Sequence, residues 1–218
     1  MTDTVTPMMG QYRRIKGELP PGVILFFRLG DFYEMFYDDA KEAAPILDVT
    51  LTQRNGMPMC GVPFHAVDGY LAKLIRAGRK VAVCDQLEDP ATTKGIVRRD
   101  VTRIVTPGTV MEDGILESNR HNFLAGVFRS GDTFGLALLD LSTGLFTAEE
   151  MTRADGLADS LKSFAPSECA ISDTQAENAE LRSVLGEVPA LHVSPCDGWT
   201  FDYDAAYQEY ITEPDLPE

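Results

Sequence analysis

The sequence predicts an α/β protein of two domains. Strand and helix patterns alternate through the first 105 residues, and three closely spaced strand patterns follow a break before helix and strand alternate again. The charge changes at the same break: residues 1–110 carry 14 Lys and Arg against 13 Asp and Glu, and the remainder carries 5 against 21. Such asymmetry suggests domains with different partners. We expect a first domain at 1–110, a linker at 111–120, a second domain at 121–211 and an acidic, proline-rich tail at 212–218.

The composition, with 44% hydrophobic and 24% charged residues, is typical of a globular protein. No apolar run approaches the roughly 20 residues of a membrane span, and the N-terminus lacks the basic and apolar regions of a secretory signal. The four cysteines form no C-x-x-C pair, so a reduced, cytoplasmic protein without disulfides or a zinc ribbon is the simplest account. Cys60 and His65 are close in sequence, but two ligands do not make a metal site, so we expect none.

The first domain begins with a clear helix start, because Thr6 suits the N-cap and Pro7 the first helical position. Asn55 and Gly56 lie at the centre of a predicted turn at 54–58, and Pro45 should kink or shorten its helix. The expected elements are a helix at 7–17 carrying Met8, Tyr12 and Ile15 on one side, strands at 23–28 and 32–37, a helix at 38–47, a strand at 49–53, a helix at 66–77, a strand at 81–87 buried on both faces, and an edge strand at 97–105.

The second domain opens with strands at 122–129, 133–140 and 144–149, whose short connections predict an antiparallel meander. The expected elements that follow are a helix at 153–164, a strand at 168–172, a helix at 176–185, a strand at 191–193 and a helix at 203–210. Three antiparallel strands followed by alternating helix and strand resemble the ribonuclease-H-like plan. A nuclease of that type needs several carboxylates clustered around two metals. Asp140 is a candidate without evident partners, and such an Asp also commonly begins the turn after a strand.

The most distinctive stretch is 26–37, which packs six aromatic residues into twelve positions around a turn at Gly30 and Asp31. Phe32 and Glu34 follow that turn two residues apart, so in a strand they share a face near a place that a ligand could reach. The alternative is a hairpin whose aromatics, Phe32 included, fill a core while Glu34 is merely exposed.

Basic clusters occur in the first half only, for example Arg76, Arg79 and Lys80. The acidic second half would be repelled by phosphates, so only the first domain is a credible nucleic-acid surface. Each cluster could equally be a solvated face. The strand pattern at 97–105 places Arg99 and Arg103 in one alternating set and Arg98 in the other, which indicates arginines on both faces at a sheet edge.

Several segments, taken together and in order, resemble the MutS family of bacterial DNA mismatch-recognition proteins, whereas no P-loop, G-x-S-x-G or H-E-x-x-H motif occurs. The segments are Thr6–Met9 with Gln11 and Tyr12, Leu25–Glu34, Cys60–His65, Asp85–Gln86, Arg103–Thr109 and Leu139–Gly144. The resemblance covers Thr6 to about Tyr210. It implies a mixed-sheet mismatch-recognition domain followed by a ribonuclease-H-like connector domain, as the N-terminal fragment of a longer protein with lever, clamp and ATPase domains.

The resemblance further implies that Phe32 enters the minor groove and stacks on the mispaired base, while Glu34 hydrogen-bonds that base. An apolar wedge costs a few kcal/mol of unstacking, and bending the duplex costs on the order of 1–6 kcal/mol. A mispair is already poorly stacked, so its share of that cost is smaller. Candidate supporting contacts, each weighed against a plain surface role, are Arg28, Arg54, Met59, Arg76, Arg98, Arg99 and Arg103, and Arg28 could instead brace the hairpin.

For the fragment itself we expect no catalytic residue, metal or cofactor. The resemblance implies ATP and Mg in the full-length protein, mismatched double-stranded DNA and a MutL-type mediator as partners, a homodimer through downstream domains, and a cytoplasmic, nucleoid-associated location. Two alternatives stay open at this point. One is a ribonuclease-H-like nuclease, and the other is a recombination-associated paralogue without mismatch sensing, against which the intact Phe32-x-Glu34 pair speaks.

Overall fold

The computed structural model describes residues 6–88, 95–111 and 120–212. The chain forms two compact units, Met1–Ser118 and Asn119–Glu218. Most of the expected linker and nearly all of the expected tail lie outside the described residues. No described helix combines the length and apolar character needed to cross a bilayer.

Unit 1 is built on a six-stranded mixed sheet in the order β3-β4-β2-β1-β5-β6. Strands β1 and β5 are parallel, and the other neighbours are antiparallel. The elements are α1 (Pro7–Glu18), β1 (Val23–Leu29), β2 (Phe32–Phe36), α2 (Tyr37–Leu47), β3 (Thr52–Arg54), β4 (Met57–Pro63), the 3-10 turn η1 (Phe64–Ala66), α3 (Val67–Arg76), β5 (Lys80–Gln86) and β6 (Arg99–Val105).

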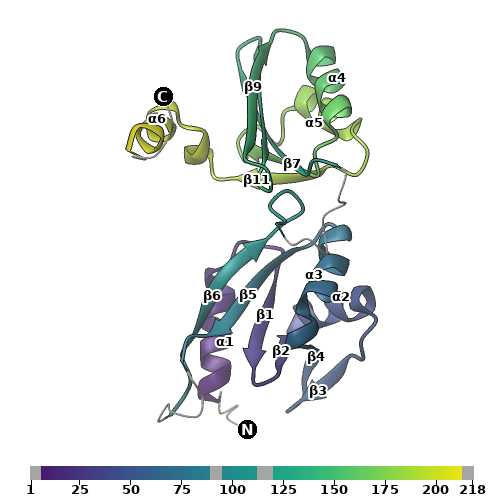
Figure 1. The fold of residues 1–218 in the computed structure, drawn as a ribbon, viewed down its shortest axis with the longest axis vertical. Helices are drawn as coiled ribbons and strands as arrows, with labels where there is room; N and C mark the ends of the chain where they lie inside the picture. Colours follow the sequence, from purple (N-terminus) through teal and green to yellow (C-terminus); the bar gives the residue numbers. More distant parts are fainter. Residues whose placement is uncertain (1–5, 89–94, 112–119, 213–218) are drawn as a thin grey trace. The chain divides into compact units, whose positions relative to one another are not determined.

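Helices cover both faces of this sheet (Figure 1). The α1 face is covered by α1, and the α2/α3 face is covered by α2 and α3. Successive residues of β1 alternate between them: Ile24 and Phe26 pack beneath α2 and α3, while Leu25 and Phe27 pack beneath α1. The central strands β1 and β5 are therefore buried on both faces, as expected for the parallel pair of a mixed sheet.

Asp39, in the first turn of α2, ties three elements of unit 1 together. The pairing of β1 with β2 ends at Phe27, and beyond it the Leu25 N–H donates to Asp39 Oδ2 at 2.9 Å. Lys16 of α1 reaches the other carboxylate oxygen, with an Nζ–Oδ1 distance of 2.7 Å. The carboxylate is buried. It thus accepts a hydrogen bond from a strand N–H at a position where the pairing of β1 with β2 has ended.

The prediction of a strand at 49–53 is wrong in position, and a strand was missed after it. β3 begins only at Thr52, and Asn55 and Gly56, at φ 52° and 79°, form the two-residue turn of a hairpin that leads into β4. The two prolines and the glycine of β4 mask its strand pattern. Its pairing with β2 on one side and β3 on the other overrides that weak local preference.

Two further expectations need correction. Helix α2 contains Pro45 and still ends at Leu47, so the proline does not shorten it, and the alternative, a kink, stays a prediction. In α1, Met9 is fully buried alongside Tyr12 and Ile15, whereas Met8 is only half-buried.

Strand β6 lies at the sheet edge, as predicted, but its faces are not those of simple alternation. Arg103 pairs with Val83, whereas Val101 pairs with Cys84, so Thr102 is an extra residue. This bulge shifts the side chains by one position. Arg99 therefore lies on the α1 face and Arg103 on the α2/α3 face, although the sequence pattern places both in one set.

Unit 2 holds a five-stranded sheet in the order β11-β10-β7-β8-β9. Its elements are β7 (Phe123–Ser130), β8 (Thr133–Asp140), β9 (Leu145–Met151), α4 (Ala154–Phe164), β10 (Glu168–Ser172), α5 (Ala179–Gly186), β11 (His192–Cys196), the 3-10 turn η2 (Gly198–Phe201) and α6 (Tyr203–Thr212). The first three strands form the antiparallel meander, and β7, β10 and β11 run parallel. Helices α4 and α5 share one core with the sheet. The ribonuclease-H-like plan is confirmed.

We predict that Asp39→Ala lowers the free energy of unfolding of unit 1 by about 2 kcal/mol, because it removes a charged acceptor and leaves Lys16 and the Leu25 N–H without it. Asp38→Ala is the matched control, since Asp38 lies in the same helical turn but its contact with Lys41 is exposed. Urea unfolding followed by circular dichroism measures the free energy of unfolding of each variant. Hydrogen exchange of the Leu25 amide measures the loss of its hydrogen bond. Equal effects of the two substitutions would contradict the assignment.

Candidate nucleic-acid interface

The β1–β2 hairpin presents Phe32 immediately after its turn. Leu29 pairs with Phe32, and Gly30 between them adopts φ 58°, in the left-handed region where a side chain would be strained. The Asp31 carbonyl accepts a hydrogen bond from the Phe64 N–H at 2.8 Å, which attaches the turn to η1. This hydrogen bond fixes the turn against η1, and Phe32 follows the turn as the first residue of β2.

The alternation of β2 places Phe32 and Glu34 on the α1 face. Tyr33 and Met35 point the other way into the core beneath α2 and α3. On the α1 face, Phe36 is covered because Tyr12 of α1 packs edge-on against it, with 5.0 Å between ring centroids. Phe32 lies four residues before Phe36, at the start of the strand, and remains 48% exposed. The same face of one strand therefore changes from core to surface between Phe36 and Phe32.

Glu34 lies between Phe27 of β1 and Gly61 of β4 and is 15% exposed. Its Oε2 is 2.6 Å from Arg54 Nη1. A Cβ atom on Gly61 would lie 3.5 Å from Glu34 Cγ, at ordinary van der Waals distance. Met59, the partner of Phe36 on β4, is half-buried on this face as well.

Arg28 braces the hairpin from the opposite face. Its Nε donates to the Gly30 carbonyl at 2.5 Å, and its guanidinium lies 3.4 Å from the centroid of the Phe64 ring. Beneath it, the Tyr33 hydroxyl donates to Asp85, and burial together with this carboxylate raises the pKa of Tyr33 to about 12. The described contacts of Arg28 therefore stiffen the turn that carries Phe32.

Arg99 is buried on the α1 face and is used within the fold. Its Nε donates to the Arg28 carbonyl at 2.7 Å and its Nη1 to the Val97 carbonyl at 3.0 Å. Its guanidinium also lies 5.3 Å from the centroid of the Phe27 ring. This placement favours a structural role for Arg99 over the phosphate contact that the sequence suggested.

The remaining arginines are exposed but are not gathered around Phe32. Arg76 lies in the last turn of α3, and Arg103 lies 3.9 Å from Asp68 on the same α2/α3 face. Arg98 precedes β6, and its main-chain N–H donates to the Glu88 carboxylate. The structure thus brings together Phe32, Glu34, Arg54 and Met59 on one face, whereas Arg76 and Arg103 lie on the opposite face.

Gly61 is the residue of this site that the sequence interpretation missed. Its place opposite Glu34 depends on β4 lying next to β2. The Asn55–Gly56 turn was the available signal, because a two-residue hairpin predicts a second strand after it. Counting along that strand would have placed Gly61 within it, although not opposite Glu34.

In unit 2, Asp140 serves the β8–β9 turn. Its buried carboxylate accepts hydrogen bonds from the Ser142 N–H at 3.0 Å, the Ser142 hydroxyl at 2.7 Å and His121 Nδ1 at 2.7 Å. Burial raises its pKa, but the hydrogen bonds from Ser142 and His121 outweigh burial and lower the pKa to about 2. Among the described residues, no group of three His, Cys, Asp or Glu side chains could hold a metal ion. Asp140 therefore has the contacts of a turn residue.

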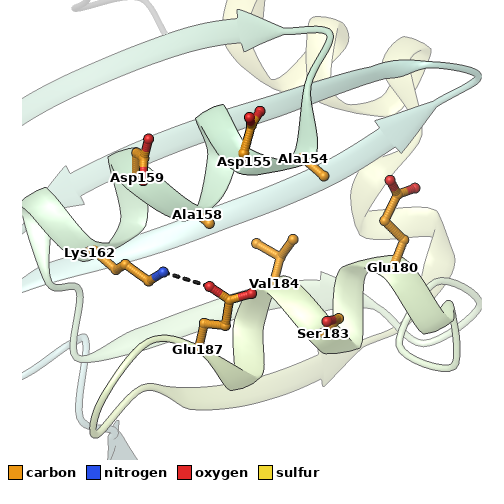
Figure 2. A pocket seen from close by; sticks show the side chains of 9 residues that line it. All are labelled: Ala154, Asp155, Ala158, Asp159, Lys162, Glu180, Ser183, Val184 and Glu187. Carbon is orange, nitrogen blue, oxygen red and sulfur yellow. Dashed lines mark hydrogen bonds and ion pairs between the residues drawn. The ribbon is translucent and has the colours of Figure 1, made fainter.

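A hollow of about 270 Å³ between α4 and α5 has the wrong charge for a phosphate (Figure 2). Four carboxylates line it, and Lys162 reaches across to one of them, Glu187, with an Nζ–Oε2 distance of 2.6 Å. The lining carboxylates belong to Asp155, Asp159, Glu180 and Glu187. Nucleic acid would be repelled there.

Comparison with known proteins finds the same two-part division. The family model of MutS domain I matches residues 6–114, and that of MutS domain II matches residues 122–213. The chain is 46% identical over 208 residues to a protein of Ruminiclostridium cellulolyticum named DNA mismatch repair protein MutS. That alignment covers 92% of this chain and 24% of the relative, so the chain spans about a quarter of the length of the curated relative it matches.

We predict that Asp140 makes unit 2 sensitive to acid. A carboxyl whose pKa is lowered by folding contributes stability above its unfolded pKa, and this contribution is lost as the pH falls from about 4 towards 2. Asp140→Asn should lower the free energy of unfolding by about 1–2 kcal/mol at neutral pH and flatten its fall in that range. Urea unfolding between pH 6 and pH 2.5 measures this. Asp132→Asn, at an exposed turn position of the same unit, should leave the pH profile unchanged.

Proposed function

The chain belongs to the MutS family, and we propose that its first unit senses mismatched or unpaired bases in duplex DNA. The observation that carries this proposal is Phe32, a half-exposed aromatic ring at a braced hairpin turn, with the Glu34 carboxylate beside it on the same face. A core aromatic would be covered, and an ordinary surface position would not need the bracing contacts of Arg28.

In this proposal Phe32 acts as a wedge in the minor groove. Inserting an apolar ring unstacks a base step and kinks the duplex, at a cost of a few kcal/mol. A mispaired step is already weakly stacked, so less of that cost remains to be met there. Discrimination then depends on how easily the duplex deforms, which suits a sensor of many different errors.

Glu34 acts as the probe of the displaced base. A carboxylate near phosphates is unfavourable unless it gains a hydrogen bond, and the exposed edge of a mispaired base offers an N–H donor. A correct pair keeps its N–H groups within the pair, so the carboxylate finds no base donor there. Glu34 therefore adds discrimination by disfavouring correct duplex.

The charge distribution supports DNA binding by the first unit alone. Residues 1–110 are nearly neutral, and the remainder carries a net charge of −16. We retain Arg76, Arg98 and Arg103 as candidate phosphate contacts because their side chains are exposed. Arg28 and Arg99 act as braces behind the site rather than as contacts.

For the whole protein we propose the wider activity of a mismatch repair sensor. Downstream domains would bind ATP and Mg, form the homodimer and grip the DNA, so the fragment alone should bind weakly and catalyse nothing. The acidic second unit would act as connector and face protein partners such as a MutL-type mediator in the cytoplasm. The contacts of Asp140 disfavour the nuclease alternative, and the Phe32–Glu34 pair disfavours a paralogue without mismatch sensing.

Phe32→Ala in the full-length protein should remove most of the preference for a G·T mismatch over a perfect duplex. Stacking of one base on an aromatic ring contributes about 1–3 kcal/mol, so we expect a loss of about tenfold or more. Fluorescence anisotropy with both duplexes measures it. Phe146→Ala is the control, because it removes an exposed phenylalanine from unit 2. Unchanged discrimination by Phe32→Ala would refute the wedge.

Glu34→Gln should reduce mismatch preference by less than Phe32→Ala does, because an amide still hydrogen-bonds a base. Affinity for the perfect duplex should be equal or tighter, since the substitution removes a negative charge near phosphates. Measuring both dissociation constants at the same salt concentration tests this. Weaker binding to the perfect duplex would contradict the role of Glu34.

A further inference from the structure

The ion pair between Arg54 and Glu34 gives Arg54 a role that the sequence did not indicate. The pair joins Arg54 Nη1 to Glu34 Oε2 at 2.6 Å, the length of a strong charge-assisted hydrogen bond. The Arg54 side chain is 42% exposed and the Glu34 side chain 15%. The arginine therefore lies at the outer side of the carboxylate that we propose as the base probe.

The sheet explains how the two residues meet. Arg54 ends β3, Glu34 lies in the middle of β2, and β4 runs between these strands. Arg54 pairs with Met57 of β4, and Glu34 pairs with Gly61 of the same strand, so both side chains rise from the same face. The long arginine side chain crosses β4 on that face and reaches the carboxylate.

This contact leaves one half of the carboxylate available. Arg54 engages Oε2, and among the described residues Oε1 accepts no hydrogen bond. An ionised carboxylate can accept at both oxygens. A base N–H could therefore bind Oε1 while Arg54 holds Oε2 and compensates the negative charge that phosphates would otherwise repel.

We propose that Arg54 is the positioning residue of the mismatch probe: it orients the Glu34 carboxylate so that Oε1 meets the base, and it neutralises its charge, instead of binding a phosphate itself. This inference rests on the proposed function of Phe32 and Glu34. It assigns Arg54 an effect on discrimination that passes entirely through Glu34.

A double-mutant cycle in the full-length protein tests the proposal. Arg54→Met, Glu34→Gln and the double variant are compared for binding to a G·T duplex and a perfect duplex at several salt concentrations. Arg54→Met alone should weaken binding to both duplexes, because it leaves an unpaired carboxylate, and should reduce mismatch preference several-fold. In the presence of Glu34→Gln it should cause no further loss of preference. Arg54→Lys should restore part of the preference, since a point charge can still pair with the carboxylate.

Arg79→Met is the matched control. Arg79 has a similar exposure and pairs with Glu42 at 2.8 Å in the same unit, away from Glu34. It should leave the mismatch preference unchanged. A thermal unfolding curve for each variant verifies that the fold is retained.

A phosphate contact would give a different pattern and would overturn the inference. Arg54→Met would then weaken both duplexes equally, with or without Glu34→Gln, and would lower the slope of log affinity against log salt by about 0.9 in both backgrounds. Phe32→Ala distinguishes a failure of the proposed function from a failure of the positioning role of Arg54. If it leaves discrimination intact, the proposed function fails and the role of Arg54 fails with it. If it abolishes discrimination while the Arg54 and Glu34 effects are additive, only the positioning role fails.

Discussion

The packing of helices against both faces of the β1–β2 hairpin is the constraint on which the rest of unit 1 depends. Side chains alternate along a strand, so the residues beneath α2 and α3 determine which residues lie beneath α1. A slip of one residue in β2 would carry Tyr33 and Met35 to the α1 face and bury Glu34 in an apolar core. The cost of burying that charge holds the register. The direction of Phe32 and Glu34 is therefore set by the packing of their neighbours in β2.

The two halves of the chain divide charge as well as structure. A net charge of −15 would oppose contact with a polyanion if it were spread evenly, but it belongs almost wholly to the second half.

Within the first unit, the arginine residues have different roles. Arg28 and Arg99 stabilise the hairpin through main-chain carbonyls and aromatic rings, and Arg54 pairs with the Glu34 carboxylate on the same face as Phe32. A guanidinium suits these tasks because it combines a planar face with a fixed set of donors.

Local sequence patterns predicted most elements because helix caps, apolar periodicity and short turns depend on residues close together in the chain. Thr6 and Pro7 mark the start of α1, the apolar stripe of α3 has helical spacing, and the meander of unit 2 follows from its short turns. The predictions fail where pairing with a neighbouring strand determines the structure. β4 carries strand-breaking residues but is held between β2 and β3. The bulge at Thr102 sends Arg99 and Arg103 to opposite faces, although their spacing predicts one face, because the extra residue is visible only in the pairing with β5.

The sequence by itself determined the two-domain α/β plan, the hairpin and the placing of Phe32 and Glu34 on one face, since period-two alternation and turn chemistry depend on neighbours along the chain. The resemblance carried by its motifs determined which of its many aromatic residues to single out. Only the tertiary structure decided that Phe32 is exposed where Phe36 is covered, that Arg99 is buried, and that Arg54 meets Glu34 across β4. Those facts depend on where α1 lies over the sheet and on which strands are neighbours, and both are set by contacts between residues far apart in the chain.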